Sequence, residues 1–482
     1  MKIGYKIVFL FLINSFFGSY QSQGLELSFS SHYKLDQNYQ SISCINHQSN
    51  HIFFQSKLKS KFCDLKVSVF GKDLEKINEI NLQLDDEYFV GVRSVFDNIV
   101  LFTYKNNGTK TVLRTRYLDV KSNFLAPKDI FSEPNISGYP SNFKIPIKTV
   151  EDQLSILVEL PFQSDKNEDI KILTLNSAMD VVKEVYNKLE IKFKSKRDNR
   201  ILLSNNGQPY LLKQFWKKGN HFYLYKLGQK VISEKEIKLN QRKIAALDYF
   251  FNSKNELVLS GFYSSPVRYN YEGFFLLKFD NDLELIHKNQ YSLSENIVKT
   301  FKSSKEIKET GYGLDKFMVT NFNLDEGGNH FLLAEHLSKL NSKKDKLWYS
   351  KGFILIKFNK NGNYIWGCPV KKEFKSENLN FVGTFSLNNN PTNQYFFNEL
   401  SNLKLKKGVP PEYGILNYTG TSNVTFSESG ICQEKAMAIN FPGKDSEKYA
   451  FIPKQLNPYN KGPAYFIIMN GKADNYMLGV VK

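Results

Sequence analysis

The sequence predicts an all-β fold, a β-propeller of seven or eight four-stranded blades. Two stretches, which begin at Gly273 and Gly352, align without a gap. Each reads as an apolar strand, a Lys-Phe exit, a turn of Asp, Asn or Gly, and a second strand. Small repeated sheets cannot bury both faces alone, and radial stacking buries them in a ring. An array of β-sandwich domains is the alternative architecture.

The apolar strand of this repeat is expected to be the third strand of each blade. Its copies recur at a mean spacing of about 57 residues. They begin near residues 65, 112, 170, 222, 274, 353, 412 and 465. Eight copies favour eight blades, and the weak copies near 112 and 412 leave seven open.

A second recurring piece lies between these copies and is expected to be the second strand. Asn255–Phe262 matches Asn329–His336, and Asn206–Phe215 is a looser copy. Aromatic-rich runs such as Leu247–Phe251 precede them across a turn, which completes a period of four strands. Helical periodicity is absent from the pattern, so no helix is expected.

The two ends of the chain carry strand patterns that bear on how the ring closes. Leu25–Ser31 is expected to complete the last blade and close the ring. Tyr476–Val481 could instead finish that blade on its own.

One copy of the repeat also resembles a known family. Lys357–Trp366 reads Lys-Phe-Asn-Lys-Asn-Gly-Asn-Tyr-Ile-Trp, similar to the Lys-Phe-Asp-x-x-Gly-Asn-x-x-Trp repeat of exported bacterial β-propellers. The copy near 274 departs from that pattern, with Leu283 at the Gly position and His287 at the Trp position. The resemblance implies the fold and no particular activity.

Residues 1–24 have the pattern of a secretory signal peptide. Lys2 and Lys6 precede the apolar run Ile7–Ile13, and small or polar residues follow it. No later segment approaches the ~20 apolar residues that span a bilayer, so no transmembrane segment is expected after signal removal. Residues 25–482 contain no linker-like tract and are expected to form a single propeller domain. The protein is therefore expected to be secreted, periplasmic or at the cell surface.

The net charge is +17, which suits an acidic ligand. Anionic glycans, lipid headgroups and extracellular nucleic acid attract such a surface, although no motif indicates specific nucleic-acid recognition. A Lys- and Asn-rich composition that merely keeps the surface soluble is the alternative.

Four cysteines, Cys44, Cys63, Cys368 and Cys432, allow two disulfides in three connectivities, or free buried thiols. None has the spacing of a redox or metal site, and no cofactor or metal is expected.

A working face follows from the strand order. In a propeller, the loops between second and third strands emerge on the same side as the connections between blades. On that side the sequence places aromatic rings and cations, which suit sugar rings and acidic groups. The expected ligand-binding residues are Trp216, Lys217, Lys218, Arg268, Tyr269, Tyr271, Lys343, Lys344, Lys346 and Trp348. The connection Ser292–Lys316 adds Lys299, Lys302, Lys305, Lys308 and Tyr312. Lysines gathered by long loops, with the tryptophans packed at loop roots, are the alternative.

No motif of a known catalytic class is present, and no catalytic residue is predicted. Glu335 and His336 are the best candidates for an acid/base pair, and a solvated strand end is the ordinary explanation for them. The expected function is therefore an exported, non-catalytic binding or scaffold protein. Its ligand would be acidic or glycan-like, or a partner protein of the cell envelope. A carbohydrate-active enzyme, either glycosidase or lyase, is the alternative, and it should bring two or more carboxylates and a His or Tyr together near the axis.

Overall fold

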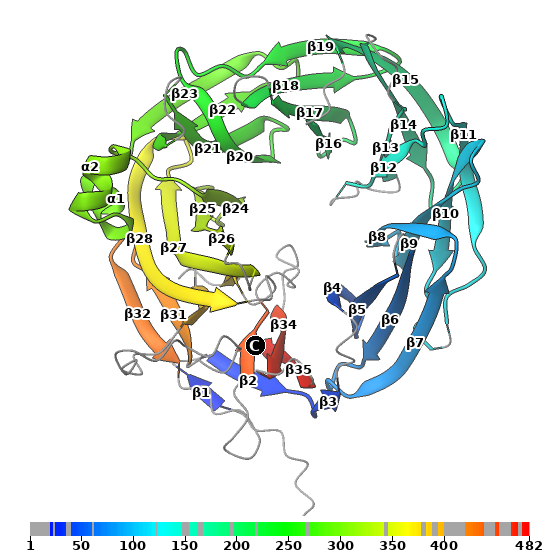
Figure 1. The fold of residues 1–482 in the computed structure, drawn as a ribbon, viewed down its shortest axis with the longest axis horizontal. Helices are drawn as coiled ribbons and strands as arrows, with labels where there is room; N and C mark the ends of the chain where they lie inside the picture. The colour runs from blue at the N-terminus through cyan, green and yellow to red at the C-terminus, as the bar shows by residue number, and fades with distance from the viewer. Residues whose placement is uncertain are drawn as a thin grey trace, which may run out of the picture.

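The computed structural model places 35 strands and two short helices within its described residues. These residues are 20–22, 25–34, 40–59, 62–121, 123–146, 154–161, 167–192, 197–216, 220–265, 270–341, 346–376, 382–387, 394–399, 420–437, 449–452, 464–470 and 475–481. The strands form small antiparallel sheets arranged in a ring around a central axis (Figure 1). The predicted all-β propeller is confirmed.

Seven sheets are built from strands that follow one another in the chain. Blade 1 contains β4 (Gln40–His47), β5 (Asn50–Lys59), β6 (Phe62–Phe70) and β7 (Lys76–Leu84). Blade 2 contains β8 (Glu87–Val95), β9 (Asn98–Asn106), β10 (Lys110–Tyr117) and β11 (Lys128–Pro134). Blade 3 contains β12 (Asn142–Lys144), β13 (Leu154–Glu159), β14 (Asn167–Leu175) and β15 (Val181–Lys192). Blade 4 contains β16 (Arg197–Leu203), β17 (Pro209–Trp216), β18 (Asn220–Leu227) and β19 (Val231–Glu236).

The remaining three consecutive blades carry the second half of the chain. Blade 5 contains β20 (Lys243–Phe251), β21 (Leu257–Ser264), β22 (Tyr271–Phe279) and β23 (Leu285–Ser292). Blade 6 contains β24 (Phe317–Leu324), β25 (His330–His336), β27 (Lys346–Phe358) and β28 (Tyr364–Ser376), and the short β26 (Ser338–Asn341) pairs with the start of β27. Blade 7 contains β29 (Thr384–Leu387), β30 (Gln394–Glu399), β31 (Gly420–Phe426) and β32 (Cys432–Met437).

The eighth sheet joins both ends of the chain and closes the ring (Figure 1). It contains β33 (Tyr449–Phe451), β34 (Ala464–Asn470), β35 (Asn475–Val481), β2 (Leu25–Phe29) and β1 (Tyr20–Ser22), with β3 (Tyr33–Lys34) paired to β35. The prediction that Leu25–Ser31 supplies a closing strand is confirmed by the pairing of β2 with β35. The alternative, in which Tyr476–Val481 ends the blade, is wrong because β35 lies between β34 and β2.

Six of the eight predicted third strands are the third strands of blades 1 to 6. The copy near 465 is β34, the second strand of the closing sheet, so that prediction is wrong. Its position shifts because β2, from the other end of the chain, takes the outer place beside β35. The copy near 412 lies outside the described residues, and the third strand of blade 7 is β31.

The glycine that opens the repeated strand has a steric explanation. A Cβ added at Gly273 would collide with the carbonyl oxygen of Tyr291 on the neighbouring fourth strand. At Gly352 it would collide in the same way with the carbonyl oxygen of Val370. The close approach of third and fourth strands therefore requires a residue without a side chain in both blades.

The apolar core lies between adjacent blades. One cluster joins Leu212 and Leu224 of blade 4 to Leu259 and Leu277 of blade 5. Strand β21 is buried at every position, because the flanking blades cover both of its faces. Each blade thus buries its faces only with its neighbours in place, as the repeat predicts.

Two helices, α1 (Glu295–Phe301) and α2 (Ser304–Thr310), connect blade 5 to blade 6. The expectation of no helix is wrong here. Each helix has only seven residues, too few to show a period, but both have capping signals: the Ser294 side chain accepts from Ile297 N, and Ser303 with Glu306 forms a capping box. Apolar residues of α1 pack into the core of blades 5 and 6. Within the described segments, neither helix is long enough to cross a bilayer.

Candidate ligand-binding pocket

The structure describes four of the ten predicted ligand-binding residues. Lys217, Lys218, Arg268, Tyr269, Lys343 and Lys344 lie outside the described residues. Trp216 ends β17 with 44% of its surface exposed. Tyr271 stacks on Phe262 with ring centroids 5.5 Å apart and packs against the core.

Trp348 and Lys346 both lie in β27. The Trp348 ring packs against the core between blade 1 and the closing sheet, with Lys339 Nζ 5.6 Å from its centroid. Trp216, Tyr271 and Trp348 do not line the pocket described next. Tyr271 and Trp348 both pack against apolar clusters, and binding by the ten residues stays a prediction.

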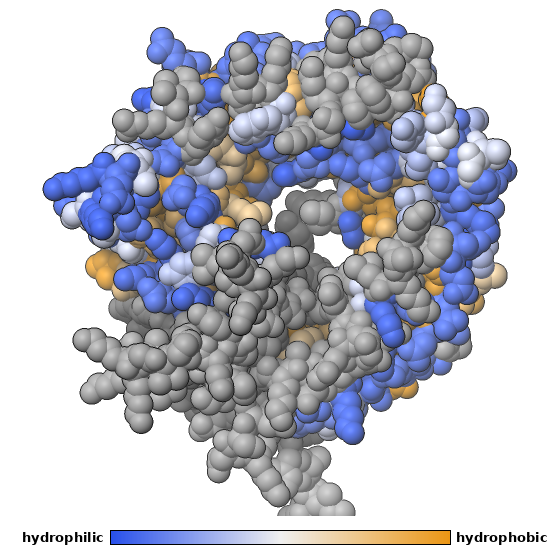
Figure 2. Space-filling model, viewed as in Figure 1, coloured by the Kyte–Doolittle hydropathy of each residue, from blue (hydrophilic) through white to orange (hydrophobic). Residues whose placement is uncertain are grey.

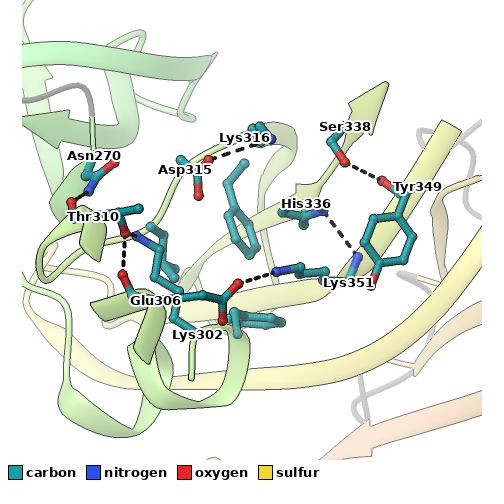
Figure 3. Close-up of a pocket in the computed structure, with 13 residues that line it drawn as sticks. Asn270, Lys302, Glu306, Thr310, Asp315, Lys316, His336, Ser338, Tyr349 and Lys351 are labelled. Carbon is teal, nitrogen blue, oxygen red and sulfur yellow. Dashed lines mark hydrogen bonds and ion pairs between the residues drawn. The ribbon is translucent and has the colours of Figure 1, made fainter. Parts of the chain in front are cut away.

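On the side of the propeller where the connections between blades emerge, the described residues form a pocket of about 270 Å³. It lies between the helical connection and blade 6 (Figure 3). The connection contributes one wall, and the ends of β25 and β26 and the first half of β27 contribute the other. Its lining residues are Asn270, Phe301, Lys302, Glu306, Thr310, Leu314, Asp315, Lys316, Phe317, His336, Ser338, Tyr349 and Lys351. The surface over α1 and α2 is mostly hydrophilic (Figure 2).

Backbone contacts fix the connection against blade 5. Leu314 and Tyr271 form an isolated antiparallel bridge, and Asn270 Nδ2 donates to the Thr310 carbonyl at 2.6 Å. Phe301 packs edge-on against Phe317 with centroids 5.0 Å apart, which joins the end of α1 to the start of β24. The pocket walls are thereby held by core packing rather than by the loop alone.

Lys302 is the most unusual residue of the pocket. Its side chain follows directly on α1 and is only 8% exposed. Burial lowers the pKa of its ammonium group, against the opposing charges of Asp315 and Glu306. An ammonium group has three N–H donors, and among the described residues its one hydrogen-bond partner is Thr310 Oγ1 at 2.9 Å. It therefore has donors to offer to a molecule in the pocket.

His336 is buried between the ring edges of Phe317 and Tyr349, at centroid distances of 5.6 and 5.9 Å. Burial lowers its pKa to about 4, so the imidazole is neutral at neutral pH. Its Nδ1 accepts the backbone N–H of Lys351 at 3.2 Å, which places the proton on Nε2. His336 is thus a hydrogen-bond donor at Nε2 and has no free acceptor nitrogen for proton abstraction.

The charges of the pocket leave an excess of one cation at neutral pH. Lys351 Nζ lies 3.3 Å from Glu306 Oε1, and Lys316 Nζ lies 4.0 Å from Asp315 Oδ2. Hydrogen bonds from Ser303, backbone and side chain, lower the pKa of Glu306 to about 2. Burial raises the pKa of Tyr349, which stays a neutral phenol. Lys302 is the lysine without an ion pair among the described residues of the pocket.

The predicted acid/base pair of Glu335 and His336 is not formed. Consecutive residues of a strand point to opposite faces of the sheet. Glu335 therefore points away from the pocket and pairs with buried Lys372, at 3.1 Å from its Nζ. The expectation of a solvated strand end is also wrong, because both residues are buried.

Two other buried carboxylates meet between blades 3 and 4. Asn199 Nδ2 donates to Glu159 Oε1 at 2.8 Å and to Glu168 Oε1 at 2.6 Å. Glu168 also pairs with Lys213 and with Arg197. The hydrogen bonds and ion pairs among these side chains satisfy their polar groups and join blade 3 to blade 4. Across the described ranges, no three His, Cys, Asp or Glu residues gather where they could hold a metal ion.

No protein-family model matches the chain, and no curated protein matches it. Solved structures match over most of its length at low identity. A polysaccharide lyase, Uly1, is 9% identical, with 81% of this chain and 89% of that one covered and a TM-score of 0.38. A member of the DUF4221 family from Bacteroides vulgatus is 14% identical, with 86% and 99% covered and a TM-score of 0.35. The β-propeller domain of the Trilobed protease from Pyrococcus furiosus is 9% identical, with 70% and 96% covered and a TM-score of 0.33. At these values the similarities carry no argument about what this chain binds or does.

Two residues considered from the sequence line the pocket. Lys302 was among the lysines expected on the working face, and His336 was singled out for its position at a strand end. The sequence did not predict the burial of Lys302. That burial depends on α1 and α2, which are too short to show a helical period. The one available signal was the Ser303–Glu306 capping box, which marks the start of α2 directly after Lys302.

Proposed function

We propose that this protein is an exported, non-catalytic β-propeller that binds an acidic, glycan-like ligand in the pocket at Lys302. The observation that carries the proposal is a buried ammonium group with donors to spare at the wall of a pocket. Burying a cation without full hydrogen bonding costs stability, so such a group is typical of a binding site. The signal-like pattern of residues 1–24 and the basic composition support the same assignment.

The size and chemistry of the pocket favour one acidic sugar unit or a group of that size. A volume of about 270 Å³ is near the lower end for small-molecule sites. Lys302 would pair with a ligand carboxylate or sulfate. The Tyr349 hydroxyl and His336 Nε2 supply neutral donors for ligand oxygens, Ser338 Oγ is an acceptor because its hydrogen is donated to the Tyr349 carbonyl, and the rings of Phe317 and Tyr349 supply apolar surface.

Replacing Lys302 with Met should weaken binding of a uronic-acid disaccharide at least about tenfold, because a charge-assisted contact is lost. Isothermal titration calorimetry of the full chain measures this directly. Lys308→Met is the matched control, since Lys308 lies on the exposed side of α2, outside the pocket, and should leave the affinity unchanged. A neutral disaccharide of the same size should bind more weakly to the wild-type protein. Equal binding of acidic and neutral disaccharides would contradict the proposal, as would wild-type affinity in Lys302→Met.

The same variant should be at least as stable as the wild-type protein. Met fills a similar volume and removes a buried charge, so the free energy of unfolding should stay equal or rise by about 1 kcal/mol. Urea unfolding measures it. A loss of more than about 2 kcal/mol would show that Lys302 serves the fold rather than a ligand.

The non-catalytic part of the proposal has its own test. Uronic-acid polymers incubated with the wild-type protein should keep their length, as followed by new reducing ends and unsaturated sugar ends. Cleavage would instead support the carbohydrate-active alternative.

A further inference from the structure

The seam between blades 6 and 7 is tightly packed where β28 faces β31 and the β31–β32 turn. The Trp366 ring on β28 stacks on Phe426 of β31, with centroids 5.7 Å apart and planes 18° from parallel. Its Nε1 donates to the Glu428 carbonyl at 2.9 Å. Gly430, with a φ of +82°, allows the β31–β32 turn to lie against the indole, because a Cβ there would collide with it. Strand β28 is thus held in a fixed relation to β31 and the turn that follows it.

Two cysteines occupy this seam. Cys368 follows Trp366 by two residues on β28, so both side chains point to the same face of that sheet. Cys432 is directly opposite Phe426 in the β31–β32 register, so these two side chains share a face as well. Because Trp366 stacks on Phe426, the thiols of Cys368 and Cys432 are brought together across the seam.

Packing and electrostatics agree with that geometry. Both thiols are half-buried against the same apolar cluster of blades 6 and 7. A hydrogen bond from Cys432 lowers the pKa of Cys368, against the opposing effect of burial. That hydrogen bond therefore favours the Cys368 thiolate.

The other two cysteines cannot pair with each other. Cys44 is opposite Phe53, which is opposite Ser68 of β6. Cys63 lies five residues from Ser68 along the same strand, a distance of roughly 16 Å. A disulfide needs Cα atoms within about 7 Å. In addition, burial raises the pKa of Cys44 to about 12, which keeps it an unreactive thiol.

We propose that Cys368 and Cys432 form a disulfide that ties blade 6 to blade 7 when the protein meets a thiol–disulfide oxidant such as glutathione disulfide. The Cys368 thiolate attacks one sulfur of the oxidant and releases one glutathione thiolate, leaving a mixed disulfide. The Cys432 thiolate then attacks the Cys368 sulfur and releases the second glutathione. Two protein thiols are oxidised, and their two electrons and two protons reside in two reduced glutathione molecules.

The full chain incubated with glutathione disulfide should yield a cross-linked peptide that contains Cys368 and Cys432, and alkylation after denaturation should find two thiols, at Cys44 and Cys63. Mass spectrometry of a non-reduced digest after thiol blocking identifies the link. The oxidised protein should have a Tm about 5 °C above that of the reduced protein, because the bond closes a long loop.

Cys368→Ser should lose both the cross-link and the Tm difference, and Cys432→Ser should do the same. Cys44→Ala is the control and should keep both. Four free thiols after oxidation would overturn the proposal, and so would a link that maps to Cys44 or Cys63. If a serine variant does not fold, the digest of the wild-type protein with and without reductant decides the matter on its own.

Discussion

Replacing Glu168 with Gln should lower the free energy of unfolding by about 3–5 kcal/mol. Lys213, fully buried, would lose the carboxylate with which it pairs, and Arg197 would lose the same partner. Burial acts to raise the pKa of Glu168, yet Lys213 and Arg197 outweigh it and hold the pKa low. The charged pair is thus a stable part of the wall between blades 3 and 4. Urea unfolding followed by circular dichroism measures the loss.

Two further variants separate charge from volume. The double variant Glu168→Leu/Lys213→Met should recover part of the lost stability, because the buried Lys213 charge is removed together with its partner and only Arg197 loses its carboxylate. Asp282→Asn, at the surface pair with Lys226, should change stability by less than about 1 kcal/mol. A Glu168→Gln variant as stable as the wild-type protein would show that the network contributes nothing to the fold.

Acid should destabilise the protein through Glu87. Arg116 Nη1 and Nη2 each lie 2.6 Å from a Glu87 oxygen, and Thr103 Oγ1 donates to the same carboxylate. Burial opposes ionisation, but these hydrogen bonds prevail and lower the pKa of Glu87 to about 2. Because the folded pKa is below the unfolded pKa, the contribution is present above about pH 4.5 and is lost as the pH falls to about 2. It amounts to about 2–3 kcal/mol.

Urea unfolding at a series of pH values between 2 and 6 tests this contribution. Glu87→Gln should be less stable than the wild-type protein at pH 6 and should show a shallower loss of stability toward pH 2. Glu284→Gln, at an exposed pair with Lys235, should keep the wild-type slope. Parallel pH profiles for the wild-type protein and Glu87→Gln would contradict the assignment.

The strands could be predicted because each blade repeats the same local problem. A buried third strand followed by a tight turn recurs along the chain. In blades 5 and 6 a glycine, Gly273 or Gly352, stands where the third and fourth strands approach closely. Closure could not be assigned with the same certainty, since the place of β35 depends on a partner from the other end of the chain. The two helices were missed because caps and a few buried apolar residues, rather than a long period, determine them.

The pocket was only partly predictable for a related reason. Its face follows from strand order, but Lys302 and His336 come from different elements, and only the fold brings them to one cavity. The sequence shows Lys302 as one more lysine in a basic connection. Its burial, which distinguishes it from exposed Lys308, comes from the packing of Phe301 against Phe317.

The pairing of β2 with β35 has a consequence for the order in which the blades fold. Leu478 and Ser30 exchange hydrogen bonds across a separation of 448 residues. Contacts so distant in the chain form slowly, because a long segment must first be brought together. During synthesis β2 has no partner until β35 has been made. The ring of blades thus closes last. A truncation before Asn475 would remove β35 and leave the other blades as an open arc.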